Sequence, residues 1–283
     1  MPVRSFPKLD PDQISETRDA LHAYSRIAGH WLKQIRARRK HWWHASLRPS
    51  LNGLSTGVVY GATDFEMELD LRRSELQVRV ATGNSLTESL RGQSAVALAE
   101  QVQRFLAASG AVRDKKIDVS QIADVEFPSY SVKAAQAIAH ALNGVAAQMS
   151  ELRARLREES SPIQLWPHHF DLSMIWLPGH KVVGQDPADE EYADKQMNFG
   201  FTFGDEGIPE PYFYVTAYPL PAALPAINLP PGAQWKSDGF SGAVLLYRHF
   251  STHRNPSEFL QAFWSRLHEA GQRHLATDSD TND

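Results

Sequence analysis

A strict alternation of apolar and acidic residues runs through positions 64–71 and limits the folds that this chain can adopt. Phe65, Met67 and Leu69 alternate with Glu66 and Glu68. Successive side chains of a β-strand point to opposite faces of its sheet, so this segment would have one apolar face and one charged face. The pattern predicts an amphipathic strand in an antiparallel sheet with one face in water.

The same order of elements, strands and then a helix, occurs twice in the chain. Strand patterns in the first half, where period-two alternation begins at Trp42, precede a helical pattern that ends near Gly110. In the second half we expect four strands, which would span residues 165–176, 197–203, 211–218 and 240–247. A closing helix would then begin at the capping residues 255–258. We therefore predict an α+β fold of two antiparallel sheet-plus-helix halves, which suggests a duplicated architecture.

Several local signals mark helix ends in the first half. Asp10-Pro11-Asp12-Gln13 combines a capping residue with a proline at the first helical position, which is typical of a helix start. Gly29 is expected to end or bend this helix before a second helical stretch over residues 30–40. Ser85-Leu86-Thr87-Glu88 reads as a capping box and predicts a helix from there to Gly110.

A long helix from about Val132 to Glu158 is expected to join the two halves. Its apolar residues recur at gaps of four and three: Ile138, Leu142, Val145, Met149, Leu152 and Leu156. The stripe would pack on the protein itself, or alternatively form a dimer seam. The predicted organisation is an N-terminal half over 1–130, a connector helix over 131–160, a C-terminal half over 161–275 and a disordered polar tail over 276–283.

Composition excludes several classes of protein and site. There is no cysteine, which rules out disulfides, thiolate metal sites and cysteine nucleophiles. The formal net charge of -4 argues against a tight nucleic-acid binder. No apolar run is long enough for a membrane span, and the N-terminus lacks the apolar core of a secretory signal. We expect a cytoplasmic protein, and the sequence leaves the oligomeric state open.

The polar face of the second sheet is the place where a site is expected. If strand alternation holds, His169 and Asp171 share one face of the first strand, as acid–base groups or polar anchors. Glycines would form the floor of a pocket, and residues 178–196 a lid. The expected ligand contacts are Tyr212, Tyr214, Asp205, Asn198 and Trp166. A solvated sheet face with packed tyrosines is the alternative.

His169-Phe170-Asp171 also has the His-x-Asp form used by non-haem iron oxygenases. His249 could supply the second histidine of such a site. Three residues are a short pattern in a chain with 12 histidines. We therefore predict no metal or other cofactor, with iron held by His169, Asp171 and His249 as the alternative.

Basic residues gather beside two tryptophans in the first half. The cluster comprises Lys33, Arg36, Arg38, Arg39 and Lys40, and it precedes Trp42 and Trp43. Such a group can form a phosphate-binding patch with aromatic stacking. A solvated helix face is the interpretation that we prefer, given the acidic chain as a whole.

The order of several motifs resembles a known family. The motifs are Leu54-Ser55-Thr56-Gly57, the segment 65–70, Trp166-Pro167-His168-His169-Phe170-Asp171-Leu172, Asn198-Phe199-Gly200-Phe201 with Gly204-Asp205, Pro211-Tyr212-Phe213-Tyr214, Trp235 and Phe259-Leu260. Together they resemble the uncharacterised bacterial family catalogued as domain of unknown function 5996, over roughly His30 to Leu267. The resemblance implies no reaction, cofactor or catalytic residue. In that family glycine and serine can precede Phe-Asp-Leu, which argues against a metal role for His169.

The function expected from the sequence is that of a small-molecule binding protein or a metal-independent enzyme with a polar, tyrosine-rich pocket on the C-terminal sheet. One alternative is a non-catalytic protein-interaction module. The other is a non-haem iron oxygenase. Substrate, reaction and pathway are not predicted.

Overall fold

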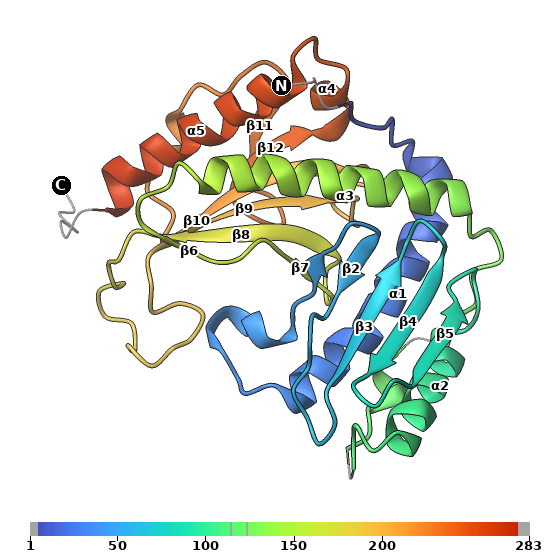
Figure 1. The fold of residues 1–283 in the computed structure, drawn as a ribbon. Coiled ribbons are helices and arrows are strands. Elements are labelled where there is room, and N and C mark those ends of the chain that lie inside the picture. The colour runs from blue at the N-terminus through green and yellow to red at the C-terminus, as the bar shows by residue number, and fades with distance from the viewer. Residues whose placement is uncertain (1–4, 114, 123, 277–283) are drawn as a thin grey trace. The chain divides into compact units, whose positions relative to one another are not determined.

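The computed structural model describes residues 5–113, 115–122 and 124–276, and it has an α+β fold with two antiparallel sheets (Figure 1). The chain divides into two compact units. The first, here called the N-terminal unit, comprises Leu9–Asn143 and Gln164–Asp171. The second, the C-terminal unit, comprises Met1–Lys8, Gly144–Ile163 and Leu172–Asp283. All but the first residue of the predicted tail lies outside the described residues.

The sheet of the N-terminal unit has five antiparallel strands in sequence order. The strands are β1 (Arg48–Pro49), β2 (Gly53–Ser55), β3 (Phe65–Asp70), β4 (Glu75–Val80) and β5 (Ser85–Ser89). Phe65, Met67 and Leu69 of β3 are buried, as the alternation predicts. On the opposite face Arg79 Nη2 lies 3.2 Å from carboxylate oxygens of both Glu66 and Glu68. The predicted amphipathic strand is therefore confirmed.

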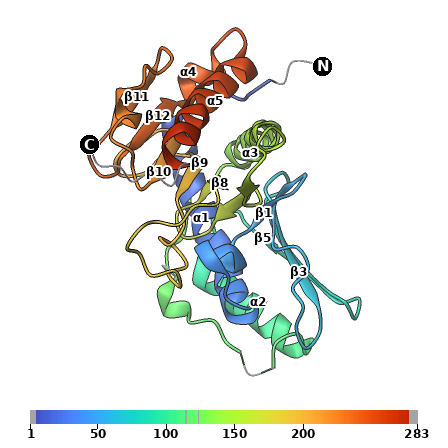
Figure 2. The same cartoon turned by 90° about the vertical axis from the view of Figure 1, so that its left-hand side faces the viewer.

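Helices α1 (Pro11–Ile35) and α2 (Ala95–Ala108) cover one face of this sheet (Figure 2). α1 begins where the capping signal predicts, because an Asp10 carboxylate oxygen accepts the Asp12 backbone N–H at 3.2 Å. The predicted break at Gly29 is wrong, since α1 continues to Ile35. A glycine costs about 1 kcal/mol relative to alanine in a helix. The buried face of a 25-residue helix outweighs that cost.

The predicted helix from Ser85 is also wrong at its start. Residues 85–89 form β5, which pairs with β4 from Arg79↔Ser85 to Glu75↔Ser89. α2 begins ten residues later, where the Ser94 hydroxyl accepts the Ala97 backbone N–H at 3.2 Å. The sheet edge therefore overrides the capping pattern of residues 85–88, because strand pairing satisfies the same backbone groups.

The second sheet has the strand order β11-β12-β10-β9-β8-β6, with β7 off this path. The strands are β6 (Glu159–Ser160), β7 (Gln164–Trp166), β8 (Asp171–Leu177), β9 (Gln196–Thr202), β10 (Tyr212–Tyr218), β11 (Ala233–Lys236) and β12 (Gly242–Leu246). β9 and β10 pair over their full length, from Tyr212↔Thr202 to Tyr218↔Gln196. Short 3-10 helices lie at η1 (Lys40–Ala45), η2 (Val119–Gln121) and η3 (Leu224–Ala226).

Aromatic side chains fill the core of the C-terminal unit. Phe213 of β10 contacts Phe201 of β9, Phe250 of α4 (Tyr247–Ser251) and Trp264 of α5 (Pro256–Leu275). All four rings are fully buried. α5 begins after Asn255, as its sequence predicts. This helix and the paired strands therefore share one apolar core.

The predicted long helix is α3 (Val132–Arg153), which ends five residues earlier than expected. Its residues up to Asn143 belong to the N-terminal unit and those from Gly144 to the C-terminal unit. Five members of its apolar stripe are fully or almost fully buried within the chain itself: Ile138, Leu142, Val145, Met149 and Leu152. That burial confirms packing on the protein rather than an exposed dimer seam. Across the described ranges, no helix is both long and apolar enough to cross a membrane.

Candidate functional site

The structure changes the surroundings of His169. The predicted strand over residues 165–176 is interrupted, because β7 ends at Trp166 and β8 begins at Asp171. Residues 167–170 form a turn in which the Phe170 N–H donates to the Trp166 carbonyl oxygen at 2.7 Å. Phe170 has a φ of 57°, which is uncommon outside glycine. The prediction that His169 lies on a strand face with Asp171 is therefore wrong.

Two predicted site residues of this segment, Trp166 and His169, lie on either side of His168, which was not predicted as a site residue. The His168 ring is 4.4 Å from that of His169 and 6.0 Å from that of Trp166, measured between centroids. His168 and His169 are exposed, whereas Trp166 and Asp171 are each 8% exposed. The histidines can therefore meet a ligand from solvent, and Asp171 is set back in the protein.

The other predicted site residues lie in the C-terminal unit. Tyr212 donates its hydroxyl to the Asp205 carboxylate, and its ring centroid is 6.2 Å from that of Tyr214. Asn198 is paired with Thr216 across β9 and β10. Phe240 contacts both tyrosine rings. The structure thus brings the predicted tyrosines together with Asp205, while their role in ligand binding stays a prediction.

The alternative of a non-haem iron site requires two histidines and one carboxylate around a single metal ion. His169 and Asp171 belong to the N-terminal unit, and His249 belongs to the C-terminal unit. In the part of the chain that the structure describes, no three histidine, aspartate or glutamate side chains are placed to hold a metal ion. The described residues therefore do not support the iron hypothesis.

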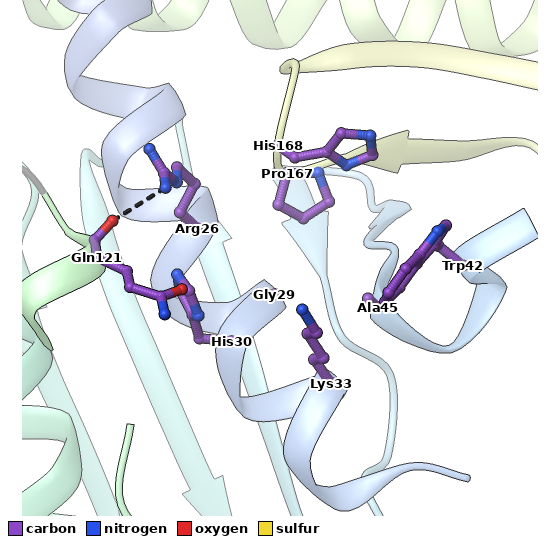
Figure 3. A pocket seen from close by; sticks show the side chains of 9 residues that line it. All are labelled: Arg26, Gly29, His30, Lys33, Trp42, Ala45, Gln121, Pro167 and His168. Atoms are coloured by element: carbon purple, nitrogen blue, oxygen red, sulfur yellow. Dashed lines mark hydrogen bonds between the residues drawn. The ribbon is translucent and has the colours of Figure 1, made fainter. Parts of the chain in front are cut away.

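A cavity of about 330 Å³ lies within the N-terminal unit, and it is the better-built candidate site (Figure 3). Its described lining comprises Arg26, Gly29, His30, Lys33, Trp42, Ala45, Gln121, Pro167 and His168. These residues come from α1, η1, η2 and the turn after β7. None of them is acidic, so the lining is basic, aromatic and apolar. We call this cavity the basic pocket.

One face of α1 supplies the charged wall of the basic pocket. Arg26, His30 and Lys33 are spaced at i, i+4 and i+7, which places their side chains along one side of a helix. The Arg26 guanidinium donates to the Gln121 carbonyl oxygen at 2.9 Å, as Figure 3 shows. That hydrogen bond ties the wall to the η2 segment.

The aromatic wall is Trp42, which is held in an unusual backbone conformation. His41 and Trp42 have φ angles of 52° and 57° inside η1, so the period-two strand expected from Trp42 onward is absent. The ring of Trp42 has Lys33 Nζ 4.9 Å and Arg38 Cζ 5.1 Å from its centroid. Residues at positive φ outside glycine cost about 1–3 kcal/mol and concentrate at ligand sites. Lys33 and Arg38 of the basic cluster thus make cation–π contacts with Trp42 and remain exposed to solvent.

The turn after β7 forms the third wall and is bound to α1 at two points. His22 Nε2 donates to the His168 carbonyl oxygen at 3.2 Å. A Cβ atom on Gly29 would lie 2.9 Å from Pro167 Cβ, so only glycine allows this approach. Gly29 therefore serves close packing rather than a break in the helix.

The histidines of the basic pocket are poor bases in this setting. Loss of water contacts lowers the pKa of His168 to about 4, and the nearby His169, His22 and Arg26 act in the same direction. Burial also lowers the pKa of His30, assisted by Arg26 and Lys33 and opposed by Asp118. Both imidazoles are therefore neutral at pH 7, and each can accept a proton or a hydrogen bond.

Sequence reasoning passed over most of this pocket. A signal was present, because Arg26, His30 and Lys33 mark one face of a continuous helix. Because a helix break was expected at Gly29, Arg26 was assigned to one helix and His30 and Lys33 to another. Their common face was therefore not recognised. Gly29 contacts Pro167, which lies far from it in the sequence. A local sequence pattern therefore cannot predict this contact.

A family model described as "Family of unknown function (DUF5996)" matches residues 6–282. This match confirms the resemblance drawn from the sequence motifs. No curated protein and no solved structure matches the chain.

Proposed function

The chain belongs to the DUF5996 family, whose function is unknown, and we propose that it binds a small anionic organic molecule in the basic pocket without the help of a metal. We further propose that it acts in the cytoplasm, because a chain without cysteine forms none of the disulfides that are common in oxidising compartments. The proposal keeps the small-molecule function expected from the sequence and moves its site to the N-terminal unit.

The observation that supports the proposal best is the combination of Arg26, Lys33 and Trp42 around one cavity whose described lining contains no acid. Two cations without an acidic neighbour in the lining favour an anion. The indole of Trp42, which also contacts Lys33, Arg38 and His44, provides an aromatic wall for the remainder of the ligand. Ligand sites typically combine such an apolar wall with a few polar groups that converge on the cavity.

His168 gives the basic pocket a neutral hydrogen-bond acceptor. Its imidazole is neutral at pH 7 and its side chain is exposed. A neutral imidazole can accept a hydrogen bond from a bound hydroxyl or amine, while Arg26 and Lys33 attract the anionic group of the same molecule. The lowered pKa of His168 makes it a weak general base at pH 7.

Calorimetric titration with small anions tests the proposal. The panel is inorganic phosphate, benzoate and AMP, titrated into the full chain at pH 7.5. Binding by at least one of them is expected, and Lys33→Gln should weaken it about tenfold or more, since each tenfold change corresponds to about 1.4 kcal/mol. Lys133→Gln is the matched control, because Lys133 is an exposed cation on α3 outside the lining.

Two results would contradict the proposal. One is the absence of binding by every anion in the panel. The other is an equal loss of binding in Lys33→Gln and Lys133→Gln, which would indicate a general charge effect. Circular dichroism of each variant verifies that the fold is intact.

The polar face of the C-terminal sheet is a second candidate site. The side-chain oxygens of Gln196 and Asn198 are buried and have no hydrogen-bond partner among the described residues. Buried acceptors of this kind favour a bound donor, such as a ligand hydroxyl or amine. Tyr214 lies on the same strand pair, with Gly200 as its partner on β9. Titration with neutral polyols, in wild type and in Asn198→Leu, tests this second candidate.

A further inference from the structure

We infer that the ligand of the basic pocket joins a planar aromatic group to a doubly charged phosphate, as a nucleoside monophosphate does. The inference rests on the proposed binding function and names the chemical class of the ligand. Three properties of the pocket support it: the separation of its apolar and polar ends, its charge and its size.

The basic pocket has two chemically different ends. Figure 3 shows Trp42 and Ala45 at one end, with Arg26, His30 and Gln121 at the other. Lys33 projects between them from α1. A ligand that fits both ends has an apolar planar part for the indole and an anionic part for the guanidinium. A compact ion such as sulfate would leave the aromatic end empty.

The charge of the lining matches a dianion. Arg26 and Lys33 are permanently positive, and the described lining holds no carboxylate to neutralise them. Asp118 raises the pKa of His30 slightly against the effect of burial, but it is not part of the described lining. Because His30 and His168 are neutral at pH 7, the fixed charge of the lining is two. A phosphate monoester has a charge of about −2 above its second pKa of about 6, whereas a carboxylate has only one negative charge.

The size of the cavity limits the ligand to one aromatic group and one phosphate. About 330 Å³ lies at the small end of the range of roughly 300–1,000 Å³ that is usual for ligand pockets. A dinucleotide would need a longer site. The phosphate and the aromatic group must therefore be close neighbours in the same small molecule.

A series of matched ligands tests this inference at pH 7.5, where the phosphate monoester is a dianion. AMP is compared with adenosine 5′-methyl phosphate, which keeps the size and removes one charge, and with ribose 5-phosphate, which keeps the phosphate and removes the base. We expect AMP to bind about tenfold or more tightly than the methyl ester. We expect ribose 5-phosphate to bind roughly 5- to 150-fold more weakly than AMP, the range that corresponds to stacking of one base.

Variants assign these differences to the pocket. Lys33→Gln should reduce the preference for AMP over its methyl ester. Trp42→Leu should reduce the preference for AMP over ribose 5-phosphate, while Trp43→Leu should not, because Trp43 adjoins Trp42 in η1 but does not line the cavity. Leucine at position 42 removes the aromatic ring and keeps the backbone strain of the positive φ. Glycine would remove both the ring and the strain.

The outcomes separate this inference from the proposed function. If AMP and its methyl ester bind equally, or if ribose 5-phosphate binds as tightly as AMP, the inferred ligand class is wrong. If benzoate binds in a Lys33-dependent manner and AMP does not, the class is wrong and the binding function stands. If no anion binds, both fail.

Discussion

Gly29 of α1 and Pro167 of the turn after β7 lie so close that a Cβ atom on residue 29 would be 2.9 Å from Pro167 Cβ and 3.0 Å from Pro167 Cγ. The contact joins residues that are 138 positions apart in the sequence. Both residues line the basic pocket, so the contact sets the distance between its helical wall and its turn wall. The rigid proline ring cannot rotate away from an added methyl group.

Gly29→Ala is expected to destabilise the N-terminal unit despite the better helix propensity of alanine. Propensity alone would stabilise the helix by about 1 kcal/mol. Overpacking against Pro167 costs typically 1–3 kcal/mol, and it also displaces the turn that positions His168. Urea unfolding measures the net loss. Pro167→Gly in the Gly29→Ala background should recover part of it, and strictly additive effects of the two substitutions would show that the contact is not the cause.

His168 should make the N-terminal unit less stable as the pH falls. Its pKa is about 4 in the folded protein, below the ordinary value of 6.5, so the unfolded chain binds the proton more readily. The contribution of His168 to stability is therefore complete above about pH 6.5 and is lost as the pH falls toward 4. Unfolding at pH 7 and pH 5 should show a smaller loss in His168→Gln than in wild type.

The control for the pH experiment is His140→Gln, which changes an exposed histidine of α3 outside the pocket. All three proteins have the same carboxylates. The difference in stability loss between wild type and His168→Gln therefore reports the protonation of His168. Equal losses in wild type and His168→Gln would contradict the lowered pKa. A titration of the His168 ring protons by NMR gives the same information directly.

Tyr212 and Asp205 are expected to stabilise the turn before β10. The Tyr212 hydroxyl donates to one carboxylate oxygen of Asp205, while the other accepts the Gly207 and Ile208 N–H groups at 2.8 and 2.9 Å. Tyr212→Phe should lower the free energy of unfolding of the C-terminal unit by about 1–3 kcal/mol, because the hydrogen bond is to a charged group. Tyr218→Phe is the matched control at the far end of β10. Unchanged stability of Tyr212→Phe, together with weaker ligand binding, would instead favour the ligand contact predicted from the sequence.

Local rules of sequence predict much of the fold. The alternation in β3 and the capping signal at Asp10 both predict the observed element, because strand faces and helix ends depend on near neighbours. The pattern at residues 85–88 misleads, since pairing with β4 satisfies the backbone groups that a helix would satisfy. Pairing with another strand cannot be recognised from a short stretch of sequence, because it depends on residues outside that stretch.

The candidate site was less predictable than the fold. The positive φ angles of Trp42 and Phe170 turn the chain where alternation expects a strand. Neither residue is a glycine, so nothing in the residue types indicates the turn. The pocket then arises from the contact of Gly29 with Pro167, which only the folded chain reveals.

The location of the site is tested most directly by mapping the backbone amide shifts of the full chain by NMR as AMP is added. The account predicts that the largest shifts fall on residues 26–45 and 165–170 and that they disappear in Lys33→Gln. Shifts that instead cluster on residues 196–218 would contradict it and place the site on the C-terminal sheet.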